Sequence, residues 1–539
     1  MLLFSLSSLY ANATTVYPVD TPVYQALRQL YTIEGLAMPS SAGPWSGDEL
    51  LMMLHRLDGY ALSPASRATY QYALTILSET KPSFSLGATV AVEGYLHTNT
   101  TNYTSDDDWK YNHASRRPLL SVPLEIVVSQ HFYSFAEFSL TAGKYDGGNS
   151  PTSGASSLYG ESTFTNSLQG LTQLDANIPY RAFSAWGGEG WLLEVGRDKL
   201  SWGPGMTGNF MLGDHVQYHN QGRFTAYGDT FKFTFVTSFF PHPDEIWETD
   251  VPGGYRQGRP LKGLKMFMGH RLEWRLFGGK VGFVLSEGLM YQPKNGALDL
   301  RVLNPMMLYH NYFIRSDTNS IASMEMDVAI IPHWNMYAQF AVDELAFGSV
   351  ERNLTSGRHP DGLGYMLGLA YASPLSKGIL YGSLEGVYTD PYLYLRSVDG
   401  NTSQTDSDWL DSLNFVVALR RWFSDQLIYD QEFLGYRNGG DAIVGNLEVG
   451  YKEYGAWSVK GTLFYMAHGA MALDSPWKLD MPKRTPSGSV THYIDAGISG
   501  STSFSEGWEA HAGLDLLARI ADWTPTYDIQ LYMGVGYTF

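Results

Sequence analysis

The last nine residues, LYMGVGYTF at positions 531–539, alternate between two kinds of side chain. One set is large and apolar and ends in Phe539; the other set consists of Tyr532, Gly534, Gly536 and Thr538. In a β-strand, successive side chains point to opposite faces, so this pattern places the apolar set on one face. The chain is therefore expected to end in an amphipathic β-strand.

The same period of two continues from about residue 84 to the C-terminus. In FKFTFVTSF (231–239) one face is nearly all Phe, and in residues 324–330 Met324, Met326, Val328 and Ile330 alternate with acidic side chains. A soluble sandwich also alternates. Repeated segments of about ten residues with aromatic and Met faces favour a lipid-facing surface, and a final strand with terminal Phe looks like the signal read by the outer-membrane assembly machinery.

We therefore predict an all-β transmembrane outer-membrane β-barrel over residues 84–539. At roughly 25 residues per strand and connection, it has about 18 antiparallel strands, within the range of bacterial barrels. This predicts the outer membrane as the location, and outer-membrane lipid and the barrel assembly machinery as partners. We expect a monomer.

The composition agrees with an exported β-protein. Aromatic residues make up 14% of the chain and charged residues only 17%, against about 25% in soluble domains. There is no cysteine, which excludes disulfides and thiolate metal sites. The net charge is −18 without a basic cluster, which argues against nucleic-acid binding. No cofactor or metal is expected.

The N-terminal eighty residues follow different rules. Residues 2–9 are apolar and Ala11-Asn12-Ala13 fits a cleavage site, which predicts a signal peptide over residues 1–13, with a buried N-terminal segment as the alternative. Thr21-Pro22, Ser63-Pro64 and the capping box from Ser46 to Glu49 predict helices near 22–34, 64–79 and 47–58. We interpret residues 20–80 as a periplasmic helical bundle.

Residues 203–208, GPGMTG, match the G-x-G-x-x-G fingerprint of dinucleotide-binding loops. That loop needs a helix directly after it, an acidic residue about twenty positions on, and βαβ alternation. Asp229 lies near the required distance, but residues 209–214 lack helical periodicity and no βαβ pattern follows. We therefore reject nucleotide binding and predict a tight inter-strand loop.

Other candidate chemistry is weak. His215 and His219 are four residues apart without a third ligand in a known pattern, so a lumen or loop pair is favoured over a metal site. The acid pairs Asp343-Glu344 and Asp430/Glu432 could serve a glycosidase. Barrel lumens are also rich in carboxylates, so no catalytic residue is assigned and a non-enzymatic protein is expected.

Glu287 interrupts the pattern because it falls on the apolar phase of residues 281–291. A carboxylate facing lipid at mid-depth costs a few kcal/mol. Two interpretations remain open at this point. Either the strand ends near Ser286, or a bulge at Gly288 turns Glu287 toward the arginines of the lumen.

Several stretches together resemble the Wzi-type outer-membrane proteins of capsule assembly. They are GPWSGDELLMML (43–54), GRDKLSWGPGMTGNFMLGD (196–214), GHRLEWRL (269–276), LSEGLMY (285–291), LNPMMLY (303–309) and FAVDEL (340–345). The resemblance implies an eighteen-stranded barrel with a periplasmic helical bundle. It also implies a non-enzymatic protein that binds carbohydrate and tethers capsular polysaccharide to the cell surface.

Within these stretches the polar and aromatic residues are candidate polysaccharide contacts, since sugars need aromatic faces and planar hydrogen-bonding groups. The candidates are Arg197, Asp198, Trp202, Arg271, Glu273, Arg275, Glu287 and Asp343. For the ladder of residues 271, 273 and 275, cross-strand charge pairing that stiffens the barrel is the alternative. A diffusion porin, which needs an open lumen, is the alternative function.

Overall fold

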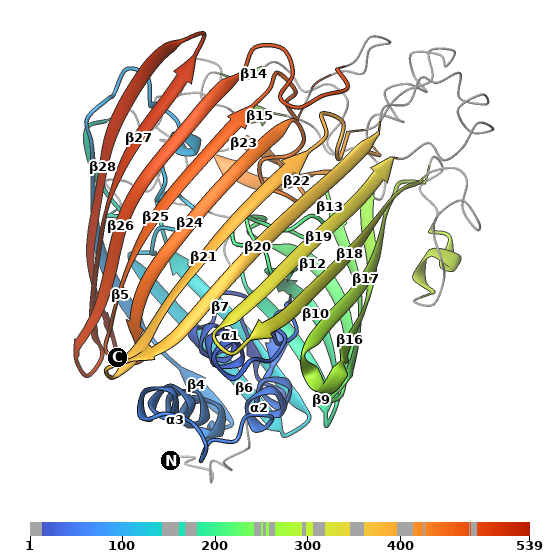
Figure 1. Cartoon of the computed structure of the whole chain (residues 1–539), viewed down its shortest axis with the longest axis vertical. Coiled ribbons are helices and arrows are strands. Elements are labelled where there is room, and N and C mark those ends of the chain that lie inside the picture. The colour runs from blue at the N-terminus through green and yellow to red at the C-terminus, as the bar shows by residue number, and fades with distance from the viewer. Residues whose placement is uncertain are drawn as a thin grey trace, which may run out of the picture.

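In the computed structural model the chain folds into a closed β-barrel (Figure 1). The structure describes residues 13–142, 161–167, 180–241, 250–251, 255–257, 265–293, 298–304, 318–344, 361–395, 413–423, 426–473, 475 and 482–539. Because β4 and β5 are parts of one strand and β8 is a short segment paired with β5, these residues form an 18-strand antiparallel barrel. The predicted fold class is confirmed.

The barrel segments are β4 (Phe84–Leu86), β5 (Thr89–His97), β6 (Leu120–Ser129), β7 (Phe132–Leu140), β8 (Thr163–Thr165), β9 (Ala182–Gly188), β10 (Trp191–Asp198), β12 (His219–Tyr227), β13 (Phe231–Phe240), β16 (Lys265–Leu276), β17 (Val281–Tyr291), β18 (Thr318–Ile331), β19 (Trp334–Glu344), β20 (Gly362–Leu375), β21 (Gly378–Thr389), β24 (Ala442–Glu453), β25 (Trp457–His468), β26 (Thr491–Ser505), β27 (Trp508–Ala521) and β28 (Thr524–Thr538). Smaller sheets pair β1 (Val16–Tyr17) with β3 (Trp45–Ser46), β2 (Ala42–Gly43) with β11 (Ser201–Trp202), and β14 (Asp250–Val251), β15 (Tyr255–Gln257), β23 (Gln426–Phe433) and β22 (Val416–Phe423) in that order. Short 3₁₀ turns are η1 (Asp106–Asp108), η5 (Phe277–Gly279) and η6 (Leu300–Leu303).

The C-terminal strand closes the barrel. Strand β28 pairs with β5 in a continuous antiparallel register from Gln530↔His97 to Thr538↔Thr89. Its apolar phase faces outward, where Met533 and Val535 are exposed, while Gly534 and Gly536 of the other phase are buried. A lipid-facing barrel requires an outward apolar phase, because these side chains contact hydrocarbon. The closed sheet pairs the backbone N–H and C=O groups, which hydrocarbon could not satisfy.

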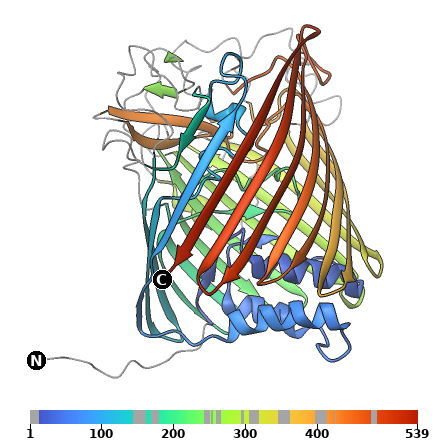
Figure 2. The same ribbon diagram turned by 90° about the vertical axis from the view of Figure 1, so that its left-hand side faces the viewer.

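The two ends of the barrel differ. At one end most strands are joined by short turns, such as residues 189–190, 376–377 and 506–507, whereas connections such as 98–119 and 199–218 at the other end are long. Outer-membrane barrels have short periplasmic turns and longer extracellular loops. By this rule we propose that the end with short turns, which also carries the N-terminal helices (Figures 1 and 2), faces the periplasm.

The three predicted helices are present as α1 (Pro22–Glu34), α2 (Gly47–His55) and α3 (Pro64–Ser78). The side chain of Ser46 accepts a hydrogen bond from the backbone N–H of Glu49, and that of Ser63 accepts one from Ser66, as N-caps do. None of the described helices is long and apolar enough to span a membrane. The predicted signal peptide lies outside the described residues, apart from Ala13.

The helices share one hydrophobic core with the barrel wall. Leu27, Leu30 and Leu54 pack together with Ala372 of β20 and Ile379 of β21. The rings of Tyr24 and Trp45 are stacked with centroids 3.9 Å apart. This packing fixes the segment after α1, residues 35–46, at the periplasmic mouth of the lumen.

Candidate functional site in the barrel lumen

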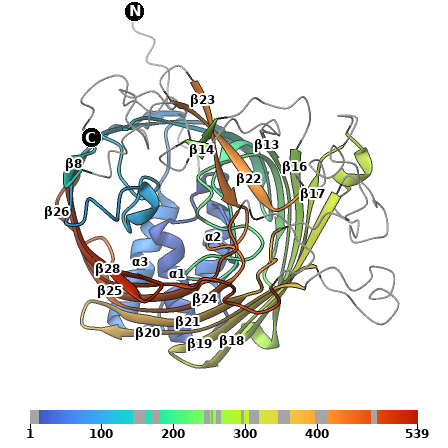
Figure 3. The same ribbon diagram turned by 90° about the horizontal axis from the view of Figure 1, so that it is seen from above.

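The segment that contains the glycine motif folds into the lumen. Residues 199–218, called the plug below, leave β10, cross the interior and return to β12 (Figure 3). Inside the barrel, β11 of the plug pairs with β2 of the N-terminal segment, and Gly203 N–H donates to the carbonyl of Ser41 (3.1 Å). The predicted tight inter-strand loop is therefore corrected: the loop is long and fills the lumen.

A single carboxylate anchors the tip of the plug on the opposite wall. Glu385 of β21 accepts hydrogen bonds from the backbone N–H of Met206 (2.7 Å), the N–H (2.9 Å) and hydroxyl (2.5 Å) of Thr207, and the hydroxyl of Tyr337 (2.7 Å). Bonds to a charged acceptor are the strong kind. The N-terminal domain adds a further contact, since Arg28 Nη2 donates to the carbonyl of Pro204 (2.7 Å).

A buried amide pair holds the base of the loop. Gln339 Nε2 of β19 donates to Asn209 Oδ1 (2.6 Å), which also accepts the N–H of Gly205 (2.9 Å), and Phe210 N–H donates to Gln339 Oε1 (3.2 Å). Both amide side chains are buried. These bonds satisfy backbone groups of an irregular segment that no sheet would otherwise pair.

Close packing explains the glycines of the motif. A Cβ on Gly203 would lie 2.2 Å from Gln339 Nε2, and a Cβ on Gly205 would lie 2.0 Å from the carbonyl oxygen of Gly208. Gly203 and Gly208 also have positive φ values of 135° and 133°, which side-chain-bearing residues rarely adopt. The spacing serves a compact plug, and no helix follows it in residues 209–218.

We expect Gly203→Ala to loosen the plug, because the new methyl group and the positive φ both conflict with the observed backbone. The free energy of unfolding should fall by about 1–3 kcal/mol, which is typical of overpacking. Urea unfolding followed by tryptophan fluorescence measures it. Gly445→Ala is the matched control, since a Cβ there meets nothing within 4 Å; equal stability of the two variants would contradict this explanation of the motif.

Trp202 belongs to the core of the plug. Its side chain is fully buried in a cluster with Phe210, Leu212, Tyr337 and Tyr436. No face of the indole ring is left for a sugar in this closed arrangement. The cluster extends to the segments around residues 392–395 and 415–419, so apolar side chains fill this half of the lumen.

The predicted charge ladder forms a buried network. Arg271 makes bidentate bonds to Glu325 (2.5 and 2.8 Å), and its Nε donates to Glu273 (3.0 Å). Two serines of the N-terminal segment join it: Ser41 Oγ accepts from Arg271 (3.0 Å) and Ser40 Oγ donates to Glu273 (3.0 Å). This geometry supports the charge-pairing alternative, and it also attaches the N-terminal segment to the wall.

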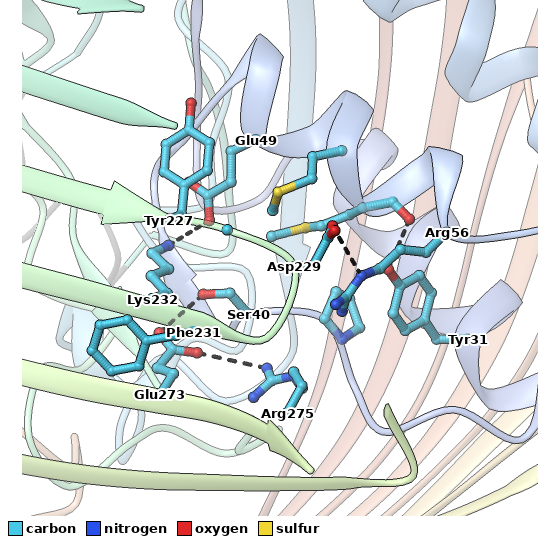
Figure 4. Close-up of a pocket in the computed structure, with 14 residues that line it drawn as sticks. Tyr31, Ser40, Glu49, Arg56, Tyr227, Asp229, Phe231, Lys232, Glu273 and Arg275 are labelled. Atoms are coloured by element: carbon cyan, nitrogen blue, oxygen red, sulfur yellow. Dashed lines mark hydrogen bonds and ion pairs between the residues drawn. The ribbon is translucent and has the colours of Figure 1, made fainter. Parts of the chain in front are cut away.

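Arg275 lies at the periplasmic end of this network. It lines a pocket between α2 and strands β12, β13 and β16, together with Tyr31, Glu49 and Lys232 (Figure 4). Lys232 bridges to Glu49 (2.6 Å), and Arg275 lies 3.6 Å from Glu273. The pocket has a volume of about 30 Å³, enough for water.

Arg197 and Asp198 lie on opposite faces of β10. Asp198 points inward, is fully buried and pairs with Arg181 (2.7 and 3.1 Å). Arg197 shares the outward phase with the exposed Val195, donates to Asn220 (3.0 Å) and lies over the ring of Tyr218 (4.2 Å). The structure therefore separates these two neighbours and keeps only Arg197 partly exposed near the extracellular end.

Both interpretations of Glu287 are wrong. Strand β17 continues to Tyr291, and its register with β16 is unbroken from Val281 onward, so there is neither a strand end near Ser286 nor a bulge at Gly288. Glu287 stays on the outward phase, directly opposite His270, with Nε2 and Oε2 3.4 Å apart. Both side chains are about nine-tenths buried, so the carboxylate faces a partner rather than hydrocarbon.

The remaining candidates act within the framework. Asp343 is buried and accepts the N–H of Tyr394 (2.8 Å), which holds the segment near residue 394 in the lumen. His219 Nδ1 lies 3.1 Å from Ser238 Oγ, and His215 Nε2 donates to the carbonyl of Phe433 (2.7 Å), so the two histidines have separate partners. The side chains of Glu344 and Asp430 lie outside the described residues.

The plug should respond to acid through His215. Burial, together with the nearby Arg437, lowers the pKa of His215 from its usual 6.5 to about 4; Asp214 opposes this effect and Lys199 adds to it. The released histidine takes up a proton near pH 6.5, so its contribution to stability is present above that pH and is lost as the pH falls toward 4.

We therefore expect amide hydrogens of residues 203–212 to exchange faster at pH 5 than at pH 7, after correction for intrinsic rates. His215→Gln, which keeps a side-chain N–H donor but does not titrate, should remove most of this difference. Identical pH dependence in the variant would show that other groups control the plug.

A second segment folds inward that the sequence patterns did not predict. Residues 98–119, called the first insert, pack inside β5, β27 and β28: Asp108 pairs with Arg519 (2.9 Å), and the guanidinium of Arg116 lies over the rings of Tyr95 (4.5 Å) and Phe164 (4.7 Å). The stretch DDDWKYNHASRRP (106–118) combines acids, aromatics and arginines, which is the signal that could have identified it.

Fold and lumen together define the class of protein. It is an outer-membrane β-barrel with 18 antiparallel strands, and two inward segments and an N-terminal helical domain occupy its interior in the described residues. A scan against protein-family models finds no match, and a search of curated proteins finds none either.

Among solved structures the fold is similar to Wzi, an outer-membrane protein of Escherichia coli involved in group 1 capsule assembly and described as a carbohydrate-binding β-barrel. The TM-score is 0.60 with 14% identity, over 99% of this chain and 100% of that chain. At this identity the likeness shows a Wzi-like fold. The channel DcaP of Acinetobacter baumannii (TM-score 0.34, 10% identity, 85% and 97% coverage) and OprD of Pseudomonas aeruginosa (0.39, 8%, 85% and 95%) also match.

Proposed function

We propose that this protein binds or anchors surface polysaccharide, of capsular type, at the outer membrane and catalyses no reaction. The observation that carries the proposal is the anchored plug: three hydrogen bonds from Met206 and Thr207 hold it to Glu385 across the lumen. A barrel whose interior is held closed in this way is suited to presenting an extracellular surface. The likeness to a solved barrel described as carbohydrate-binding gives further support.

Among the sequence-predicted contacts, Arg197 is the candidate for touching glycan directly. Its guanidinium stacks on Tyr218 near the extracellular end of β10 and is partly exposed. The buried ring of Tyr218 holds the guanidinium in place, and the planar N–H donors of Arg197 suit sugar hydroxyls. In this proposal the other seven candidates do not touch glycan; they stabilise the plug and the barrel wall beneath the extracellular surface. Outer-membrane lipid and the barrel assembly machinery are the other proposed partners. We propose that the protein is a monomer.

A glycan array probed with the refolded full-length protein tests the proposal. We expect retention of at least one bacterial surface glycan, and weaker retention, by about tenfold or more, for Arg197→Ala. Arg301→Ala is the matched control, since Arg301 is an exposed arginine bonded to Asp299. No retention of any surface glycan by the unmodified protein would overturn the proposal.

Conductance separates the anchor from a diffusion porin. Because the plug crosses the lumen, the purified protein should show no steady, large single-channel current in planar bilayers. A stable open current from the unmodified full-length protein would favour the porin instead.

A further inference from the structure

The exposure of inward side chains indicates a second lumen compartment beyond the plug. On the wall formed by β24–β28, inward side chains are solvent-exposed: Lys460 by 47%, Glu509 by 38% and the neighbouring Arg117 of the first insert by 32%. They point inward because the alternate residues Trp457 and Trp508 are exposed on the outer face. Figure 3 places β26 and β28 on the side of the barrel opposite β16 and β17. Water therefore enters the barrel along this wall.

The compartment is closed toward the extracellular side. Lys110 of the first insert pairs with Asp495 of β26 (2.7 Å) and lies 5.1 Å from the ring centroid of Phe464 on β25. Phe464 also packs against the apolar cluster of the plug. The first insert and the apolar cluster that includes the plug thus meet at Phe464, and this contact forms the roof of the compartment.

The compartment opens toward the periplasm. The helices pack against β19, β20 and β21, and their outermost polar contacts are Lys452 with Gln25 (2.9 Å) and Tyr454 with Gln29 (2.9 Å), near the β24–β25 turn. Beyond that turn, at the periplasmic end of β26, the inward residues Ser501 and Ser503 are exposed. We name this space, between the roof and Ser503, the periplasmic vestibule.

The groups that line the vestibule match sugar chemistry. Ser458 and Ser501 share a hydrogen bond between their hydroxyls (2.9 Å), and Tyr111 stacks on Tyr532 with centroids 3.9 Å apart. Each of the exposed cations has a carboxylate partner, Lys460 with Glu448 (3.4 Å) and Arg117 with Glu509. Asp515 of β27 adds a further carboxylate near Lys460. Hydroxyls, an aromatic pair and cations that are all matched by carboxylates favour a neutral, hydroxyl-rich ligand over an acidic one.

We propose that the periplasmic vestibule binds a short neutral segment of a glycan chain. The inference rests on the proposed function and adds a second glycan site on the opposite side of the membrane from Arg197. The protein would then contact the polysaccharide before it reaches the cell surface as well as afterwards.

Cysteine labelling tests this site in the full chain, which has no natural cysteine. In cells that carry Ser501→Cys, a bulky maleimide should label the protein only after the outer membrane is permeabilised, because the vestibule faces the periplasm. Labelling of intact cells would overturn the assigned direction. Ser505→Cys, at the exposed β26–β27 hairpin, is the matched control.

In the purified protein, saturating neutral hexasaccharides of glucose, α1,4- and α1,6-linked, should slow labelling of Ser501→Cys about tenfold, as occupancy near ninety per cent requires, and leave Ser505→Cys unchanged. Protection by a glucuronic acid hexasaccharide alone would overturn the neutral class. If no hexasaccharide protects Ser501→Cys while the array still retains the protein, the vestibule proposal fails and the proposed function stands. Loss of array binding as well would overturn both.

Discussion

Replacement of Glu385 by Ala should convert a non-conducting barrel into one that conducts ions. The substitution leaves the N–H groups of Met206 and Thr207 and the hydroxyl of Tyr337 without their acceptor, while the hydroxyl of Thr207 keeps Tyr436 as a partner (3.1 Å). Each unsatisfied buried donor costs about 1–3 kcal/mol, so the anchored position of the plug should lose most of its advantage over released positions. Planar-bilayer recordings should show frequent openings that the unmodified protein lacks.

Ser383→Ala is the control for this experiment. Ser383 is also buried on the inward face of β21, two residues away, but its hydroxyl has no hydrogen-bond partner among the described residues. A variant without residues 203–209 marks the fully released state. If that deletion conducts and Glu385→Ala remains silent, Glu385 is not the anchor.

Arg271→Met should produce the largest loss of stability among single lumen substitutions. It removes the partner of Glu325 and weakens the environment of Glu273, and both carboxylates are buried. Breaking a buried ion pair by removing one partner costs about 3–5 kcal/mol, since the remaining charge stays uncompensated. Urea unfolding, read by the mobility of unheated samples on SDS gels, measures the change.

The double variant Arg271→Met/Glu325→Leu should recover part of the loss, because the orphaned carboxylate is then absent. Arg275→Met, which removes a longer ion pair of 3.6 Å with Glu273, should lower the free energy of unfolding by less than Arg271→Met does. Equal losses for Arg271→Met and Arg275→Met would contradict the central position given to Arg271.

Periodicity was sufficient to predict the barrel wall and the helices. The alternation of Leu531, Met533 and Val535 fixed which face meets lipid, and Ser46 and Ser63 marked helix starts that the structure retains. These features depend on neighbours within a few residues. Sequence alone can specify them because the side-chain period follows directly from the backbone geometry of strand or helix.

The interior of the barrel could not be predicted in the same way. Glu385 and Thr207 are 178 residues apart, and nothing near Thr207 indicates which wall the loop will reach. The position of Glu287 was predicted wrongly for a related reason. Its partner His270 lies on the neighbouring strand β16, also in the outward phase, and the sequence of either strand alone does not reveal the pair. Long-range partners decided both cases.

The short pairing of β2 with β11 also bears on how the chain assembles. Ala42 and Gly43 pair with β11 of the plug inside the barrel. The barrel wall around them is complete only when β28 joins β5. A segment that is synthesised early therefore lies inside a wall that the last strand completes. Assembly must therefore bring residues 42–43 against the plug as well as join β28 to β5, so the final fold depends on contacts made by both the early and the late parts of the chain.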